Sequence, residues 1–172
     1  VERHVGAAVP VDAAGGPPAR FAVAWAIVGW AGVLAFAIGR LSAVAQDALP
    51  QELTIAQLAV LVVNTRLMAW AEGYRGFQQR FSPRAAARVL WLSRHATPAT
   101  ALLAPVFCVG FLGATPRVLR LTWAGTALIV LAVVAVQQLP QPWRGVVDVG
   151  VVVGLTWGLV SFLALCRSAL AS

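Results

Sequence analysis

The chain has 172 residues, about the size of one domain, of which 60% are hydrophobic and only 11% are charged. A soluble domain has about a quarter of its residues charged, and a soluble fold of this size could not bury so much apolar surface. The composition therefore excludes an ordinary soluble domain and indicates a protein embedded in lipid.

The charge is strongly basic, and it comes from arginine alone. All 13 basic residues are Arg, and with six acidic residues the formal net charge is +7. A basic chain raises the question of nucleic acid binding. Most of these Arg lie between apolar segments, however, where they set membrane orientation and contact anionic headgroups. We expect the partner to be a lipid bilayer with anionic headgroups, and we expect no nucleic acid partner.

Cysteine and histidine give no sign of a metal or redox site. Cys108 and Cys166 both fall in apolar stretches, where a small buried side chain is the ordinary interpretation. The sequence has no CxxC and no Cys/His cluster. We therefore predict no metal site and no cofactor.

The first half of the chain begins with a polar tail over residues 1–20, followed by a long apolar run. We predict a membrane span over 21–40, since about 20 residues at about 1.5 Å each cross the hydrocarbon core. A second span is predicted over 53–72. It is less uniform than the first, because Asn64 and Arg66 interrupt it.

Three helix starts share one local signal, a hydroxyl residue that can cap the helix followed by Pro at the first helical position. They are Ser82-Pro83, Thr97-Pro98 and Thr115-Pro116. The first predicts a short amphipathic helix over 83–95 that lies at the cytoplasmic interface. The second predicts a tilted span or a re-entrant arm over 98–114, kinked at Pro105.

The remaining apolar runs predict spans over 117–136 and 145–166. The expected fold is thus all-α, a multi-pass transmembrane bundle in one domain over 21–172. It has about five spans, or four spans plus a re-entrant segment.

Orientation follows from the distribution of Arg between the loops. With five spans, one side collects eight Arg and the other collects four. The richer side should be cytoplasmic, which places the N-terminus there. We expect the membrane to be the bacterial cytoplasmic (inner) membrane. Arg117 and Arg120 disagree with this count, and they would agree if 98–114 were re-entrant.

The clearest packing motif is a glycine zipper in the last span, made by Gly150, Gly154 and Gly158. Glycines four residues apart line one helix face and let another backbone approach closely. The motif does not say whether the other helix belongs to this chain or to another one.

Five polar residues in or near the spans form the candidate polar site: Asn64, Arg66, Glu72, Arg75 and Asp148. Charged residues inside a membrane are costly and often functional. Each also has an ordinary structural interpretation. Arg66 can extend to the headgroups or stack on Trp70. Glu72 and Arg75 can form a surface ion pair, and Asp148 suits a helix start.

Further basic residues follow the second span and are candidates for contact with headgroups or other anions: Arg80, Arg84, Arg88 and Arg94.

Three functions are consistent with these features. The favoured one is a non-catalytic accessory or structural subunit that binds other membrane subunits, or a second copy, through the glycine stripe. The second is a small oligomeric transporter or channel with a polar path near Asn64 and Arg66. The third is a membrane enzyme acting on an anionic lipid through Glu72 and the Arg cluster. No catalytic motif is present, so the sequence favours a role other than catalysis.

Overall fold

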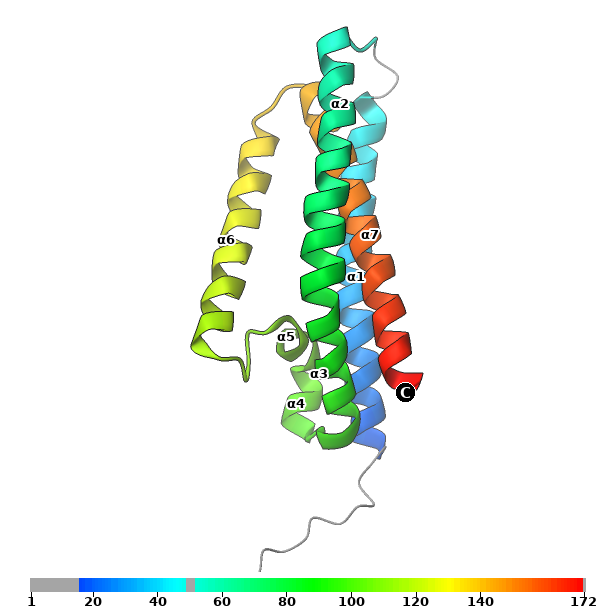
Figure 1. The fold of residues 1–172 in the computed structure, drawn as a ribbon, viewed down its shortest axis with the longest axis vertical. Coiled ribbons are helices and arrows are strands. Elements are labelled where there is room, and N and C mark those ends of the chain that lie inside the picture. The colour runs from blue at the N-terminus through cyan, green and yellow to red at the C-terminus, as the bar shows by residue number, and fades with distance from the viewer. Residues whose placement is uncertain (1–15, 49–51, 172) are drawn as a thin grey trace, which may run out of the picture.

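The computed structural model describes residues 16–48 and 52–171, and within these ranges the regular structure is helical throughout. Three long helical rods pack side by side (Figure 1). They are α1 (Pro17–Ala48), a helix that runs from residue 55 to residue 95, and α7 (Trp143–Ala171). A fourth long helix, α6 (Pro116–Gln137), stands beside them at a distance. The expected all-α class is confirmed.

Three of these helices are long and apolar enough to cross a membrane: α1 with 32 residues, α6 with 22 and α7 with 29. They contain the spans predicted over 21–40, 117–136 and 145–166. An unbroken apolar run of this length leaves lipid as the natural environment for its side chains. These three helices indicate integration in a membrane.

The middle rod differs from the prediction, which had a span over 53–72 and a separate helix over 83–95. It consists of α2 (Ile55–Met68), the π-helix η2 (Ala69–Phe81) and α3 (Ser82–His95). Thr54 caps its start, and Gln57 completes a capping box. The backbone stays helical at both junctions, Ala69 and Ser82. The residues of the expected interfacial helix therefore continue the rod, and they pack against α1 and α7.

The helix passes through Pro83 without a break, and the local hydrogen bonds show how. A proline ring normally clashes with the carbonyl four residues earlier. Here the chain arrives from a π-helix, whose wider turns bond over five residues: the N–H of Ser82 donates to Phe77 O. Near the proline, the Nε of Arg84 also donates to Arg80 O at 2.6 Å.

The segment predicted as a tilted span or a re-entrant arm, 98–114, does not form one membrane-length helix. It folds into α4 (Pro98–Leu102) and α5 (Ala104–Val109), which have five and six residues. Gly110 ends α5 with a φ of 104°, a conformation that glycine adopts without strain. Both short helices pack on α1. The chain turns back there, beside the lower ends of the rods in Figure 1.

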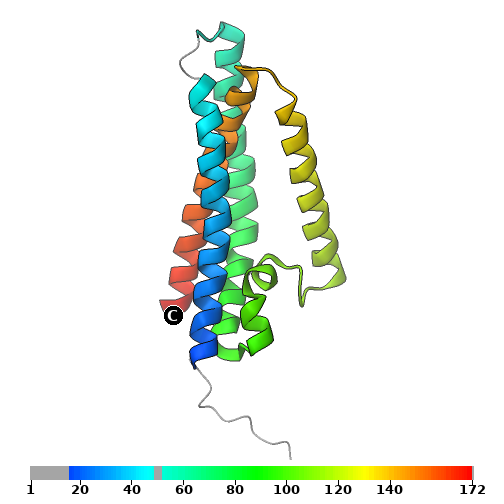
Figure 2. The ribbon, with the colours of Figure 1, turned by 180° about the vertical axis from the view of Figure 1, so that it is seen from behind.

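The directions of the helices follow from this turn. α1 runs upward in Figures 1 and 2, the 55–95 rod runs downward, α6 runs upward and α7 runs downward. The start of α1 and the end of α7 consequently lie at the same end of the bundle. An arrangement with five crossings, which puts the two ends on opposite sides, does not fit these directions.

We call the end where α1 begins and α7 ends the basic end. The helical residues near it include Arg from four of the long elements: Arg20, Arg84, Arg88, Arg94, Arg117, Arg120 and Arg167. Arg117 and Arg120 fall here because α6 begins at this end. The disagreement that they caused in the five-span count is therefore removed.

The core lies where α1, α3, α5 and α7 meet. It is built on small residues such as Ala22, Ala26 and Ala85, with Leu92 and Phe162 as its larger members. Small side chains let helices approach closely, which is how membrane helices gain van der Waals contact.

Candidate functional site

The glycine stripe of α7 faces the middle rod of the same chain. Gly150, Gly154 and Gly158 are all buried. A Cβ at Gly154 would lie 2.7 Å from Oε2 of Glu72, and one at Gly158 would lie 2.5 Å from the ring of Phe77. The middle rod of the same chain occupies this face of α7, so the glycine stripe is not free to bind a second protein.

Asn64 holds α2 to α7 at the top of this contact. Its Nδ2 donates to Val147 O at 3.0 Å and to Val146 O at 3.4 Å. Its amide sits where a side chain at Gly150 would be. Asn64 therefore links two helices and is committed to their packing.

Glu72 lies deeper along the same contact, in the first turn of η2. Its carboxylate rests over Gly154, which is close to the middle of α7. Within the described residues, no hydrogen bond or ion pair joins Glu72 to another group. An acidic group at the middle of a candidate span is expensive to place there and is a functional candidate by default.

The two arginines near Glu72 point elsewhere. Arg66 is exposed. Arg75, which was expected to pair with Glu72, stacks over the ring of Trp70 with its guanidinium carbon 5.0 Å from the ring centre. The stacking predicted for Arg66 on Trp70 is thus made by Arg75. The structure does not bring Arg66, Glu72 and Arg75 together into one charged cluster.

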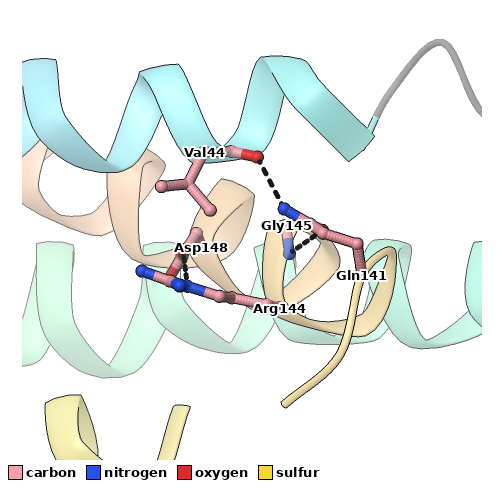
Figure 3. A network of polar contacts seen from close by, with 5 residues as sticks. All are labelled: Val44, Gln141, Arg144, Gly145 and Asp148. Atoms are coloured by element: carbon pink, nitrogen blue, oxygen red, sulfur yellow. Dashed lines mark hydrogen bonds and ion pairs between the residues drawn. The ribbon is translucent and has the colours of Figure 1, made fainter. Parts of the chain in front are cut away.

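Asp148 lies on a different part of α7, near the end opposite the basic end (Figure 3). It is buried, and its Oδ2 lies 3.9 Å from Nε of Arg144, a distance too long for a hydrogen bond. Nearby, the side chain of Gln141 bridges Val44 O of α1 and the N–H of Gly145. These contacts fasten the start of α7 to the end of α1, separately from Glu72.

The arginines predicted to contact headgroups differ in what they touch. Arg88 donates to the carbonyls of Phe107 and Leu112, and it stacks on the Phe107 ring at 5.0 Å. Arg88 therefore holds α5 and the turn after it against α3. Arg80, Arg84 and Arg94 are exposed. Since Arg84 lies three helical turns beyond Glu72, a single site joining Glu72 to this cluster is not formed.

A groove that the sequence did not reveal runs between the middle rod and α7. Its volume is about 840 Å³, and its lining is mainly apolar: Gln78, Pro83, Val152, Val153, Thr156, Trp157, Val160, Ser161, Ala164 and Leu165. Two of these residues are bonded to each other, since the Nε1 of Trp157 donates to Oε1 of Gln78 at 2.7 Å. The sequence feature that relates to it is the high number of Trp, seven in 172 residues, one of which, Trp157, lines the groove. Neither Asn64 nor Arg66 lines it.

In the part of the chain that the structure describes, no group of three or more His, Cys, Asp or Glu residues is placed to hold a metal ion. Searches against protein-family models, curated proteins and solved structures find no match to this chain.

Proposed function

We propose that this chain is a non-catalytic subunit of a membrane protein assembly, and that α6 is the helix that packs against a transmembrane helix of a neighbouring subunit. The observation that carries the proposal is the position of α6. None of its 22 residues is buried. Its contacts with its own chain are few: Trp123 meets Phe111 at 5.1 Å between ring centres, Val118 and Thr122 lie beside Gly110, and α6 has a small contact with α7.

Exposure to lipid would not by itself require a partner, because apolar side chains are as stable in lipid as in protein. The separation of α6 from the bundle is what needs an explanation. Membrane helices associate through van der Waals contact between close-packed surfaces, and α6 makes almost none with its own chain. A neighbouring helix would supply that contact.

The sequence of α6 suits such a neighbour. Between Arg120 and its last residue, Gln137, the helix has no charged residue. The hydroxyls of Thr122 and Thr126 donate to backbone carbonyls one turn earlier, so they bring no unsatisfied donor. Gly125 has open space where a Cβ would be. A close approach by another helix is therefore feasible at this point.

Gly125→Leu tests the proposal. A Cβ at Gly125 meets nothing within 4 Å, so we expect the protein to fold as before. It should, however, obstruct a neighbouring helix on α6. Gly32→Leu is the matched control, because Gly32 of α1 also has open space within 4 Å.

The measurement is the mass of the protein after mild solubilisation, by blue-native electrophoresis or light scattering. We expect wild type and Gly32→Leu to migrate as an assembly and Gly125→Leu to fall to a lower mass. A monomeric wild type, or an assembly that Gly125→Leu leaves unchanged, would contradict the proposal.

A second candidate function rests on Glu72. A carboxylate without an ion pair in the described structure, set against the middle of a candidate span, is the kind of group that carries protons across membranes. The test is proton flux into liposomes that contain the protein and a pH-sensitive dye. This candidate predicts flux in wild type and its loss in Glu72→Gln. Equal flux in the two proteins, or none in wild type, would remove it.

A further inference from the structure

We propose that the groove between the middle rod and α7 binds one acyl chain of an anionic phospholipid, whose phosphate is held at the basic end by Arg167 and Arg84. The inference is independent of the role given to α6, which lines no part of this groove.

The lining of the groove fits a hydrocarbon chain. Seven of its ten lining residues are apolar, and the three polar ones are Gln78, Thr156 and Ser161. Gln78 already accepts from Trp157. The hydroxyl of Thr156 donates to Val152 O at 2.7 Å. Few polar donors are thus left in the groove for a polar ligand to bind.

The length of the groove fits one leaflet. It follows α7 from Val152 to Leu165, which is about 20 Å at about 1.5 Å per residue. Half of a bilayer core is about 15 Å thick. A groove of this length therefore suits the acyl chain of a lipid that enters from one membrane surface.

Charge identifies the surface from which the lipid enters. After Asp148, the next charged residue of α7 is Arg167, three residues beyond the groove residue Ala164 and on the same helix face. On the opposite wall, Arg84 directly follows Pro83. The Nε of Arg84 donates to Arg80 O, and the remaining N–H groups of its guanidinium can donate to a phosphate.

At the other end the last groove residues are Val152 and Val153, well inside α7. The charged group beside α7 at this level is the carboxylate of Glu72 over Gly154, which would not attract an anionic headgroup. Arg167 and Arg84 thus follow the groove residues Ala164 and Pro83 at one end. An apolar groove with basic residues beyond one end is the chemical pattern that suits an anionic phospholipid in its leaflet. A zwitterionic phospholipid has the same chains, but its headgroup adds a positive charge that the arginines would not favour.

The experiment uses the full chain in nanodiscs with a phosphatidylglycerol that carries a photoreactive diazirine in its acyl chain. Labelled peptides are mapped by mass spectrometry. We expect adducts concentrated on residues 152–165 and 78–83. Excess unlabelled phosphatidylglycerol should compete better than excess phosphatidylcholine.

Two variants separate the apolar and charged parts of the site. Ala164→Phe should fill the groove and remove most of the labelling there, whereas Ala24→Phe, at an exposed position on α1, should not. Arg167→Gln should weaken competition by phosphatidylglycerol by about fivefold, the effect of about 1 kcal/mol per basic residue near an anionic surface. Arg120→Gln, which removes a charge from α6, should leave it unchanged.

Adducts spread evenly over α1, α6 and α7 of the wild-type protein would overturn the proposal, and this result does not depend on any variant. Equal competition by the two lipids would overturn its anionic part. The far-ultraviolet circular dichroism of each variant is compared with that of wild type. A loss of labelling that is caused by unfolding is then recognised by a loss of helical signal.

Discussion

At the scale of single residues, the contact between α7 and the middle rod depends on glycine. Asn64, Glu72 and Phe77 each occupy the space that a side chain would need at Gly150, Gly154 and Gly158 respectively. The spacing of these glycines predicted a close helix contact. It did not identify the helix opposite, because spacing on one helix carries no information about its neighbour. For the same reason the placing of Glu72 over Gly154 was not predictable.

Gly158→Leu should destabilise the fold. Its Cβ would lie 2.5 Å from the Phe77 ring, and Phe77 is held in turn by an edge contact with Phe81 at 5.4 Å. Overpacking of this kind costs about 1–3 kcal/mol. The measurement is the free energy of unfolding in mixed detergent micelles. Gly125→Leu, the same substitution in open space, serves as the control and should lose little. Equal stability of the two variants would show that the stripe is not tightly packed.

At the scale of the elements, the sequence predicts the long apolar helices, but it does not predict correctly where one helix ends and the next begins. Helices α1, α6 and α7 were anticipated because an apolar run of about 20 residues has few alternatives in lipid. Ser82-Pro83 carries the sequence signal of a helix start, yet the helix runs through it. The signal concerns the first turn alone, whereas the outcome depends on η2 before the proline and on the packing of α3 against α1 and α7.

Spin labels can test the continuity of the middle rod. Val62 and Arg94 are both exposed, so labels there should disturb little. If 55–95 is one rod, the 32 steps between them correspond to about 45 Å. Pulsed electron resonance should give a single narrow distribution near that value. A markedly shorter or broad distribution would indicate a helix that bends at residues 82–83 to lie along the membrane surface.

At the scale of the whole molecule, the short helices α4 and α5 decide the topology. They turn the chain back at the basic end, so that α6 begins there and Arg117 and Arg120 join the other arginines. The Arg counts had already pointed to this arrangement through the misplaced Arg117 and Arg120. Composition alone could not choose it, because 98–114 is apolar whether it crosses the membrane or turns back. We propose from these directions that the chain crosses the membrane an even number of times, with the basic end cytoplasmic.

The measurement that tests this topology most directly is the location of reporters fused to the two ends of the chain in intact cells. A fluorescent protein that folds only in the cytoplasm and a phosphatase active only outside it are each fused to either terminus. We expect cytoplasmic fluorescence and no phosphatase activity at both ends. An N-terminal fusion that fluoresces together with a C-terminal fusion that has phosphatase activity would show an odd number of crossings and rule out the proposed topology.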